Sequence, residues 1–189
     1  FSGIQMYNPS TDDFSLPAKS VLNKTFSLVT GSIMEKRNGE IWIASPAPGR
    51  LSIKGEELVV DFLNLPIPKN HFPDQFEEDA VGNIWVAVGG VGVYKITAYN
   101  RIKLYLGNIK NLHSLSLCKD SDGNIYVGSL GRGLFKYDSS KDDFDYIPYK
   151  DQNLPIKSLI SKSTDELFIG TDGKGIKIFD KKKNEIVDY

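Results

Sequence analysis

The chain has 189 residues, of which 40% are hydrophobic and 25% charged, the composition of a folded globular domain rather than of a disordered segment. Basic and acidic residues nearly balance, for a formal charge of −1, so the chain lacks the basic excess typical of a nucleic-acid partner. No apolar run approaches the roughly 18 residues of a membrane helix, and the single cysteine, Cys118, excludes an internal disulfide framework.

The first 18 residues read as half of a unit that recurs later. Residues 3–7 match the third strand of the later units, and residues 14–16 fit the fourth strand. This half-unit lacks its own first two strands, and the last unit already supplies four strands of its own. We therefore expect the chain to be part of a longer protein. Further repeat units of that protein, or a second copy of the chain, would cover the ends of this segment.

Four segments then repeat along the chain with a short, regular period: RNGEIWIAS at 37–45, AVGNIWVAV at 80–88, SDGNIYVGS at 121–129 and STDELFIGT at 163–171. Their aromatic residues are 41 to 43 positions apart, at Trp42, Trp85, Tyr126 and Phe168. A glycine follows each aromatic by seven residues, at Gly49, Gly92, Gly133 and Gly175. A period near forty residues is typical of a repeat architecture in which each copy is one supersecondary unit.

Each unit reads as four short strands joined by turn residues, and no segment shows a capped helical period. The second strand of each unit is apolar almost throughout, which indicates that both of its faces are buried. Four-stranded sheets with a neighbour on each side are the blades of a β-propeller. The sequence therefore predicts an all-β fold, a partial β-propeller of four-stranded antiparallel blades, with a half-blade at 1–18 and blades at about 30–63, 75–107, 114–149 and 157–189.

Two motifs resemble ligand-binding loops but have simpler explanations. The run DSDGN at 120–124 carries carboxylates, yet calcium needs six to eight oxygens and this run leads directly into a strand. We interpret it as a hairpin turn held by its own Asp and Asn side chains. Glycine-rich segments such as SLGRG at 129–133 precede strands rather than helices, so they are not expected to bind phosphate.

The loops on one face of the propeller are the best place for a ligand, because loops on a rigid scaffold carry recognition. His71 and His113 are 42 residues apart and occupy nearly equivalent connections between blades. Zinc would need a further protein ligand, so no metal and no cofactor is predicted. The candidate ligand-binding residues of this face are His71, Phe72, His113, Arg132, Asp172 and Lys174. Cys118 is expected to be a small core or channel-lining thiol.

The segments DSDGNIYVGSLGRGLFKYD and DAVGNIWVAVGGVGVYKI resemble the two-component regulator propeller repeat. That repeat forms the periplasmic sensor region of bacterial hybrid two-component sensor histidine kinases, in which it detects oligosaccharides. The resemblance implies an extracytoplasmic, non-enzymatic ligand-sensing segment of an inner-membrane protein, with the kinase elsewhere in the parent chain. It implies an oligosaccharide partner, no nucleic acid and no membrane contact by this segment.

Two other functions remain open on the residues alone. Some propellers are lyases or hydrolases, which would require His or carboxylate side chains from several blades to converge near the axis. A protein-interaction scaffold without a small-molecule ligand is the other alternative.

Two departures from the repeat are visible: the first unit has SPAPGRLSI, which predicts a hairpin of different shape, and the fourth has Asp165 in place of the turn glycine.

Overall fold

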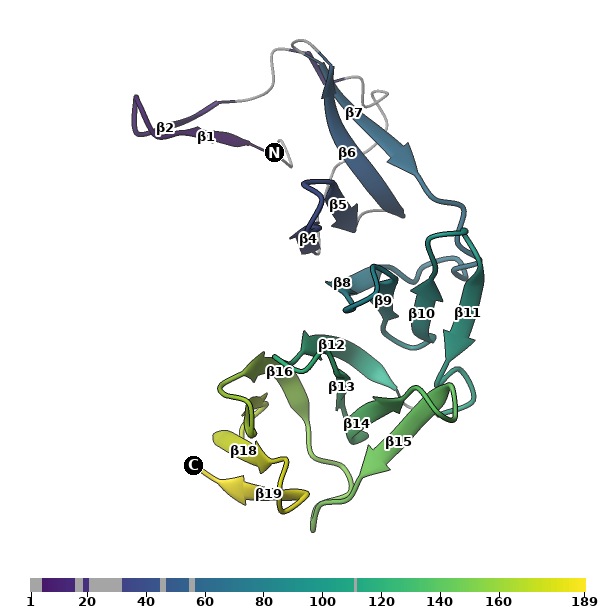
Figure 1. The fold of residues 1–189 in the computed structure, drawn as a ribbon, viewed down its shortest axis with the longest axis vertical. Helices are drawn as coiled ribbons and strands as arrows, with labels where there is room; N and C mark the ends of the chain where they lie inside the picture. The colour runs from purple at the N-terminus through teal and green to yellow at the C-terminus, as the bar shows by residue number, and fades with distance from the viewer. Residues whose placement is uncertain (1–4, 16–18, 21–31, 45–46, 55–56, 111) are drawn as a thin grey trace. The chain divides into compact units, whose positions relative to one another are not determined.

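The computed structural model describes residues 5–15, 19–20, 32–44, 47–54, 57–110 and 112–189 (Figure 1). All regular elements in these ranges are strands. The described residues therefore contain no helix that could cross a membrane. The predicted all-β class, built of four-stranded antiparallel sheets, is confirmed. The chain divides into two compact units, Phe1–Pro66 and Ile67–Tyr189. Residues 1–4 and 16–18 of the expected half-blade, and residues 30–31 of the first blade, lie outside the described residues.

The first unit contains a two-stranded hairpin and one five-stranded sheet. The hairpin pairs β1 (Met6–Asn8) with β2 (Asp13–Ser15), and Tyr7 donates a hydrogen bond to Asp12 across its turn (2.7 Å). The sheet has the order β3-β7-β6-β5-β4. Its strands are β3 (Lys19–Ser20), β4 (Ser32–Glu35), β5 (Ile41–Ala44), β6 (Pro48–Lys54) and β7 (Glu57–Phe62). Strand β3 lies at the edge of this sheet, and its two residues pair in parallel with β7. The repeat pattern does not predict this strand.

The first sheet also differs from the others in strand register. In the third copy of the sequence repeat, the residue after the aromatic is Val127. It pairs with Phe135, which lies two positions beyond the repeat glycine Gly133. In the first unit the corresponding Ile43 pairs with the glycine itself, Gly49. The pairing of β5 with β6 is therefore displaced by two residues, which bears out the expected difference in hairpin shape. Residues 45–46 of that hairpin lie outside the described residues.

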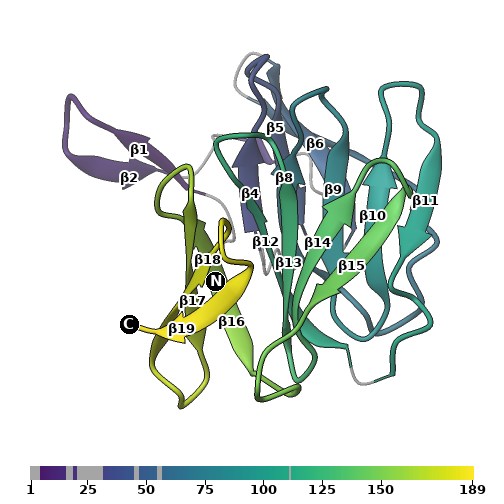
Figure 2. The same cartoon turned by 60° about the horizontal axis from the view of Figure 1, so that its bottom comes forward.

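The second unit contains three four-stranded antiparallel sheets, each with its strands in sequence order (Figure 2). The first comprises β8 (Pro73–Glu78), β9 (Ile84–Val88), β10 (Gly92–Ile96) and β11 (Ile102–Tyr105). The second comprises β12 (His113–Lys119), β13 (Ile125–Leu130), β14 (Gly133–Asp138) and β15 (Asp143–Ile147). The third comprises β16 (Ile156–Ser161), β17 (Glu166–Thr171), β18 (Ile176–Asp180) and β19 (Glu185–Asp188). We call these sheets II, III and IV, and the sheet of the first unit sheet I.

Within the second unit the sheets pack face to face, with the first strands β8, β12 and β16 adjacent. One core lies between sheets II and III and includes Trp85 and Val127, and another lies between sheets III and IV and includes Tyr126 and Ile169. Strand β13 is consequently buried on both faces, and every residue of β9 is buried as well, as the uninterrupted apolar pattern predicts. Strand β17 is buried on alternate residues only, because one face of sheet IV is exposed.

Side chains of β8 also hydrogen-bond the backbone of β12. The amide of Gln75 donates to the carbonyl of Leu117 (3.0 Å) and accepts from its backbone N–H (2.9 Å). Asp74 accepts from the backbone N–H of Leu115 (2.9 Å). These bonds satisfy backbone groups of β12 that no neighbouring strand pairs with, and so join the inner edges of sheets II and III.

Candidate functional site

The loops of the second unit lie at two opposite ends of the strands. One end, which we call the hairpin end, carries the hairpins at 89–91, 131–132 and 172–175 and the connections at 106–112 and 148–155. The backbone N–H of Gly90 donates to the carbonyl of Leu112 (2.7 Å), and that of Asp172 donates to Pro155 (2.8 Å), so hairpins and connections are in contact. The other end, the turn end, carries the turns within residues 79–83, 120–124 and 139–142.

The candidate residues predicted from the sequence all lie at the hairpin end, where they contact neighbouring connections rather than one another. Arg132 Nε donates to the carbonyl oxygen of Lys110 (2.7 Å). Asp172 forms an ion pair with Lys157 (3.2 Å), and Lys174 forms one with Asp151. The charges of these three candidates therefore already have partners within the chain.

The other three candidates are less constrained. The imidazole of His71 lies against the β9–β10 hairpin, since a Cβ atom built on Gly90 would be 3.0 Å from its Nε2. Phe72 and His113 are exposed. The ring of Phe72 is the one hydrocarbon ring among the candidates, and its exposure allows it to stack on a ligand.

At the turn end, the DSDGN segment forms a hairpin turn as predicted. The carboxylate of Asp120 is buried and accepts hydrogen bonds from the backbone N–H groups of Asp122 (3.0 Å) and Asn124 (2.9 Å). Its other oxygen accepts from the Lys181 ammonium of sheet IV (2.8 Å), which lies 3.7 Å from Asp122. Burial raises the pKa of Asp120, but the hydrogen bonds from Lys181 and Asn124 outweigh it and hold the pKa below its usual value. The position that a calcium ion would take beside these carboxylates is occupied by the lysine ammonium.

The turn of sheet II repeats this arrangement, with an indole N–H in place of the lysine ammonium. Asp79 accepts from the backbone of Val81 (3.1 Å) and Asn83 (2.9 Å), and from the indole Nε1 of Trp85 (3.0 Å). In sheets I and IV a lysine–glutamate ion pair spans the same positions, Lys36–Glu40 (3.3 Å) and Lys162–Glu166 (2.9 Å). The recurring element is therefore a side-chain bridge across the turn, and not a pair of carboxylates.

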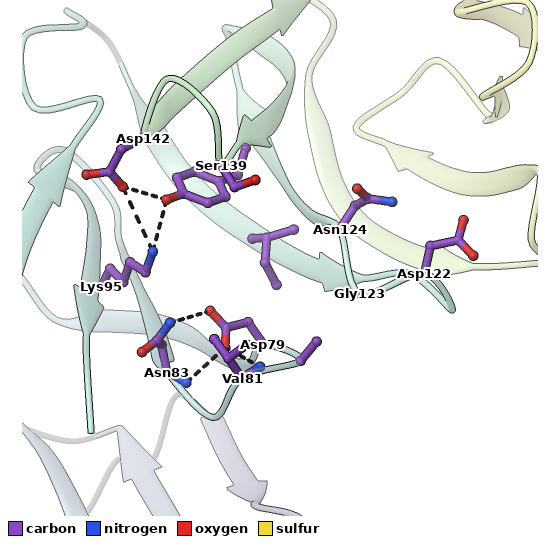
Figure 3. Close-up of a pocket in the computed structure, with 12 residues that line it drawn as sticks. Asp79, Val81, Asn83, Lys95, Asp122, Gly123, Asn124, Ser139 and Asp142 are labelled. Carbon is purple, nitrogen blue, oxygen red and sulfur yellow. Dashed lines mark hydrogen bonds and ion pairs between the residues drawn. The ribbon is translucent and has the colours of Figure 1, made fainter. Parts of the chain in front are cut away.

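A pocket of about 530 Å³ opens at the turn end, between sheets II and III (Figure 3). The turns at 79–83 and 120–124 form two of its walls, and β10 together with the β14–β15 turn forms the third. None of the six candidates predicted from the sequence lines it. Its lining includes Asn83, Lys95, Asp122, Asn124, Tyr137, Ser139 and Asp142.

The third wall is held by a network centred on Asp142. This carboxylate accepts hydrogen bonds from Lys103 Nζ (2.6 Å) and from the hydroxyls of Tyr105 (2.7 Å) and Tyr137 (2.5 Å). These donors hold the pKa of Asp142 well below its usual range. Lys95 Nζ donates to the Tyr137 hydroxyl (2.9 Å) and lies 5.0 Å from the Trp85 ring centroid. Side chains of sheet II thus bind the turn of sheet III and fix the shape of the pocket wall.

The remaining groups of the pocket suit a polar, hydroxylated ligand. Asp122 and Ser139 are exposed, and the amides of Asn83 and Asn124 lie at the walls. Carboxylate oxygens accept hydrogen bonds from hydroxyls, whereas amide and hydroxyl groups both accept and donate them. The Tyr137 ring offers an apolar surface. Within the described part of the chain, no three His, Cys, Asp or Glu side chains lie together as metal ligands would.

A recurring turn residue in the sequence marks this pocket. Before the fourth strand of a unit, an Asp or Asn recurs with positive φ, at Asp12 (52°), Asn100 (56°), Asp142 (49°) and Asn184 (53°). Asp and Asn are the non-glycine residues that most readily adopt this left-handed conformation. Aligning the units on this turn would have pointed to Asp142, whose neighbours in the adjacent sheet then define the pocket.

Cys118 lies in the core between sheets III and IV, in agreement with the predicted core or channel-lining role. Burial, and then the Glu77 carboxylate, raise the pKa of its thiol to about 11. Because only the thiolate is a nucleophile, we expect native Cys118 to resist a disulfide reagent at pH 8 and to react fully after unfolding in urea. Rapid labelling of the native protein would contradict this prediction.

Comparison with known families identifies the repeat. Residues 108–131, which span the connection to β12, β12 itself and β13, match the family model described as a two component regulator propeller. The resemblance noted in the sequence is confirmed by this match. None of the curated protein sequences matches the chain significantly.

Solved structures share the fold. The extracellular domain of the hybrid two component system BT4673 from B. thetaiotaomicron superposes with a TM-score of 0.74 at 18% identity, covering 94% of this chain and 24% of that one. That of BT3049, from the same organism, gives a TM-score of 0.63 at 16% identity, covering 85% and 24%. Virginiamycin B lyase from Staphylococcus aureus gives 0.69 at 20% identity, covering 83% and 54%. The chain thus spans about a quarter of the Bacteroides domains, and at these identities the likeness shows the β-propeller fold alone.

Proposed function

We propose that the chain is a ligand-sensing segment of the extracytoplasmic part of a two-component sensor, and that its ligands are oligosaccharides. The match of residues 108–131 to the two component regulator propeller carries this proposal. The same fold in extracellular domains of two hybrid two component systems supports it. The parent protein would be anchored in the inner membrane, with this segment in the periplasm and a histidine kinase elsewhere in its chain.

The pocket at the turn end is the better of two sites for such a ligand, because its walls come from two sheets. A ligand that contacts both Ser139 of sheet III and Asn83 of sheet II binds more tightly when the sheets are held in one spacing. Binding therefore shifts the equilibrium between packing arrangements by the difference in affinity for them. That shift is a signal that neighbouring blades or protomers can transmit. The candidates at the hairpin end offer Phe72 for stacking but present mostly paired charges.

Calorimetric titration of a panel of glycan oligosaccharides would test both sites. We expect Ser139→Trp, which fills the pocket, to weaken binding at least about tenfold, or 1.4 kcal/mol. Ser121→Trp, in a neighbouring turn at the same end of the strands but outside the lining, is the control and should bind as the wild type does. Phe72→Ala should change the affinity less than about twofold.

Three other outcomes have distinct meanings. If Phe72→Ala and His113→Ala weaken oligosaccharide binding and Ser139→Trp does not, the ligand binds at the hairpin end instead. Binding of no oligosaccharide would contradict the sensing function and favour a protein-interaction scaffold. Recovery of a chemically altered ligand after incubation would favour a lyase, the function of a propeller that shares this fold; a lyase should then lose turnover in His71→Ala or His113→Ala.

A further inference from the structure

Each of the two turns that wall the pocket at the turn end presents a side-chain amide. Asn83 and Asn124 occupy the same position in the repeat, two residues before the aromatic, where the units of sheets I and IV have glutamate. The Nδ2 group of Asn83 donates to the carboxylate of Asp79 (2.8 Å; Figure 3), and that of Asn124 donates to Asp120 (3.0 Å). Because an ionised carboxylate only accepts hydrogen bonds, the NH2 group of each amide must face it. The carbonyl oxygens of both amides are thus left as acceptors for a ligand.

The same pocket has an exposed carboxylate, that of Asp122, on the wall formed by the turn of sheet III. Its side chain is 61% exposed, and the ammonium of Lys181 lies 3.7 Å away. That ammonium is closer to the buried carboxylate of Asp120 (2.8 Å), whose charge it balances. Asp122 therefore adds a negative charge and further acceptor oxygens to the pocket wall, beside the amide of Asn124.

The lysine of the lining does not offset this charge for a ligand. Lys95 Nζ donates to the Tyr137 hydroxyl (2.9 Å) and lies 3.9 Å from the Asp142 carboxylate. The same ammonium lies 5.0 Å from the ring centroid of Trp85, and the side chain is 17% exposed. An anionic sugar could bind Lys95 only by replacing these contacts. The exposed Ser139 hydroxyl can accept as well as donate, so acceptors predominate on the pocket walls.

We propose that this pocket selects oligosaccharides that bring hydrogen-bond donors and no negative charge, namely neutral or amino sugars rather than sugars with carboxylate or sulfate groups. Hydroxyl and ammonium groups donate to the amide oxygens and to Asp122, and the bond from an ammonium is the stronger one. A carboxylate or sulfate has no proton to donate, and Asp122 repels it. This inference concerns the site of the proposed function and rests on it, with Asp122 as the residue that sets the charge preference.

Three sets of oligosaccharides, titrated calorimetrically at low ionic strength, test this selection. The neutral set contains cello-, xylo- and manno-oligosaccharides, the amino set contains chitosan oligomers, and the acidic set contains oligogalacturonates and sulfated chondroitin oligomers. We expect binding from the neutral or the amino set, weakened by Ser139→Trp, and binding at least about tenfold weaker from the acidic set.

Failure of this inference is distinguishable from failure of the sensing function. An acidic oligosaccharide that binds more tightly than the other two sets, and loses its affinity in Ser139→Trp, would overturn the charge selection and leave the sensing function standing. Absence of binding by all three sets would contradict both.

The role of Asp122 is tested by Asp122→Asn, which removes the charge and keeps an acceptor of the same size. We expect the preference over acidic ligands to shrink at least about threefold, while the affinity for neutral ligands changes less than about twofold. Asp165→Asn removes the same charge from the turn of sheet IV, outside the lining, and should keep the wild-type preference. Both positions are exposed, and circular dichroism can confirm that the variants are folded. A preference that Asp122→Asn leaves unchanged would overturn this role.

Discussion

Replacing Trp85 with alanine is expected to lower the free energy of unfolding by about 3–5 kcal/mol. Its indole is fully buried and lies against the rings of Tyr105, Tyr137 and Phe144, with centroids 5.5, 4.6 and 5.6 Å away. Two of these rings belong to sheet III, so the substitution opens a cavity between sheets. It also removes the indole donor to Asp79. Urea denaturation followed by circular dichroism measures the change.

Phe168→Ala is the matched control, because Phe168 occupies the same repeat position in a sheet with one open face. Its ring contacts Tyr189 at a centroid distance of 5.3 Å and is only half-buried. We expect a loss of about 1–2 kcal/mol in the same urea experiment. Equal losses for the two substitutions would show that coverage by a neighbouring sheet does not stabilise the repeat aromatic.

Asp120→Ala is expected to cost about 3–5 kcal/mol, because it leaves a lysine ammonium and turn amides without their buried acceptor. The Asp120 side chain is fully buried and that of Lys181 is 12% exposed. Chemical denaturation at neutral pH measures the loss. The exposed pair of Lys182 and Asp165 (2.7 Å) provides the control, and Asp165→Ala should cost less than about 1 kcal/mol.

The same carboxylate predicts a direction of pH dependence. Because folding lowers the pKa of Asp120, its contribution is complete above its unfolded pKa of about 3.9 and is lost as the pH falls through the folded value. The stability difference between wild type and Asp120→Ala should therefore narrow in acid below about pH 4. A difference that stays constant or widens there would contradict this role.

Much of the fold could be predicted from the sequence because the repeat encodes it locally. The apolar second strands indicated burial on both faces, and β9 and β13 show it. A glycine follows each repeat aromatic by seven residues, and two of these, Gly133 and Gly175, have the positive φ values, 72° and 69°, that favour glycine. The DSDGN turn followed from the hydrogen-bonding chemistry of Asp and Asn.

The unpredicted features arise where a unit departs from the repeat or where two units meet. The segment SPAPGRLSI indicated a different hairpin in sheet I, but the two-residue size of the register displacement is hidden by the constant spacing between Trp42 and Gly49. The parallel strand β3 is only two residues long, too short for any pattern. The pocket depends on Lys95 and Lys103 of sheet II reaching Asp142 of sheet III, a contact across 39 or more residues of sequence that no single-unit motif contains.

A double-mutant cycle on Asp120 and Lys181 tests most directly whether neighbouring sheets pack face to face. Asp120 lies between β12 and β13 of sheet III, and Lys181 lies between β18 and β19 of sheet IV, so the two can interact only if the sheets are stacked. From the stabilities of Asp120→Ala, Lys181→Met and the double variant, we expect a coupling free energy of about 1–3 kcal/mol. A coupling indistinguishable from zero would contradict the stacked arrangement of blades.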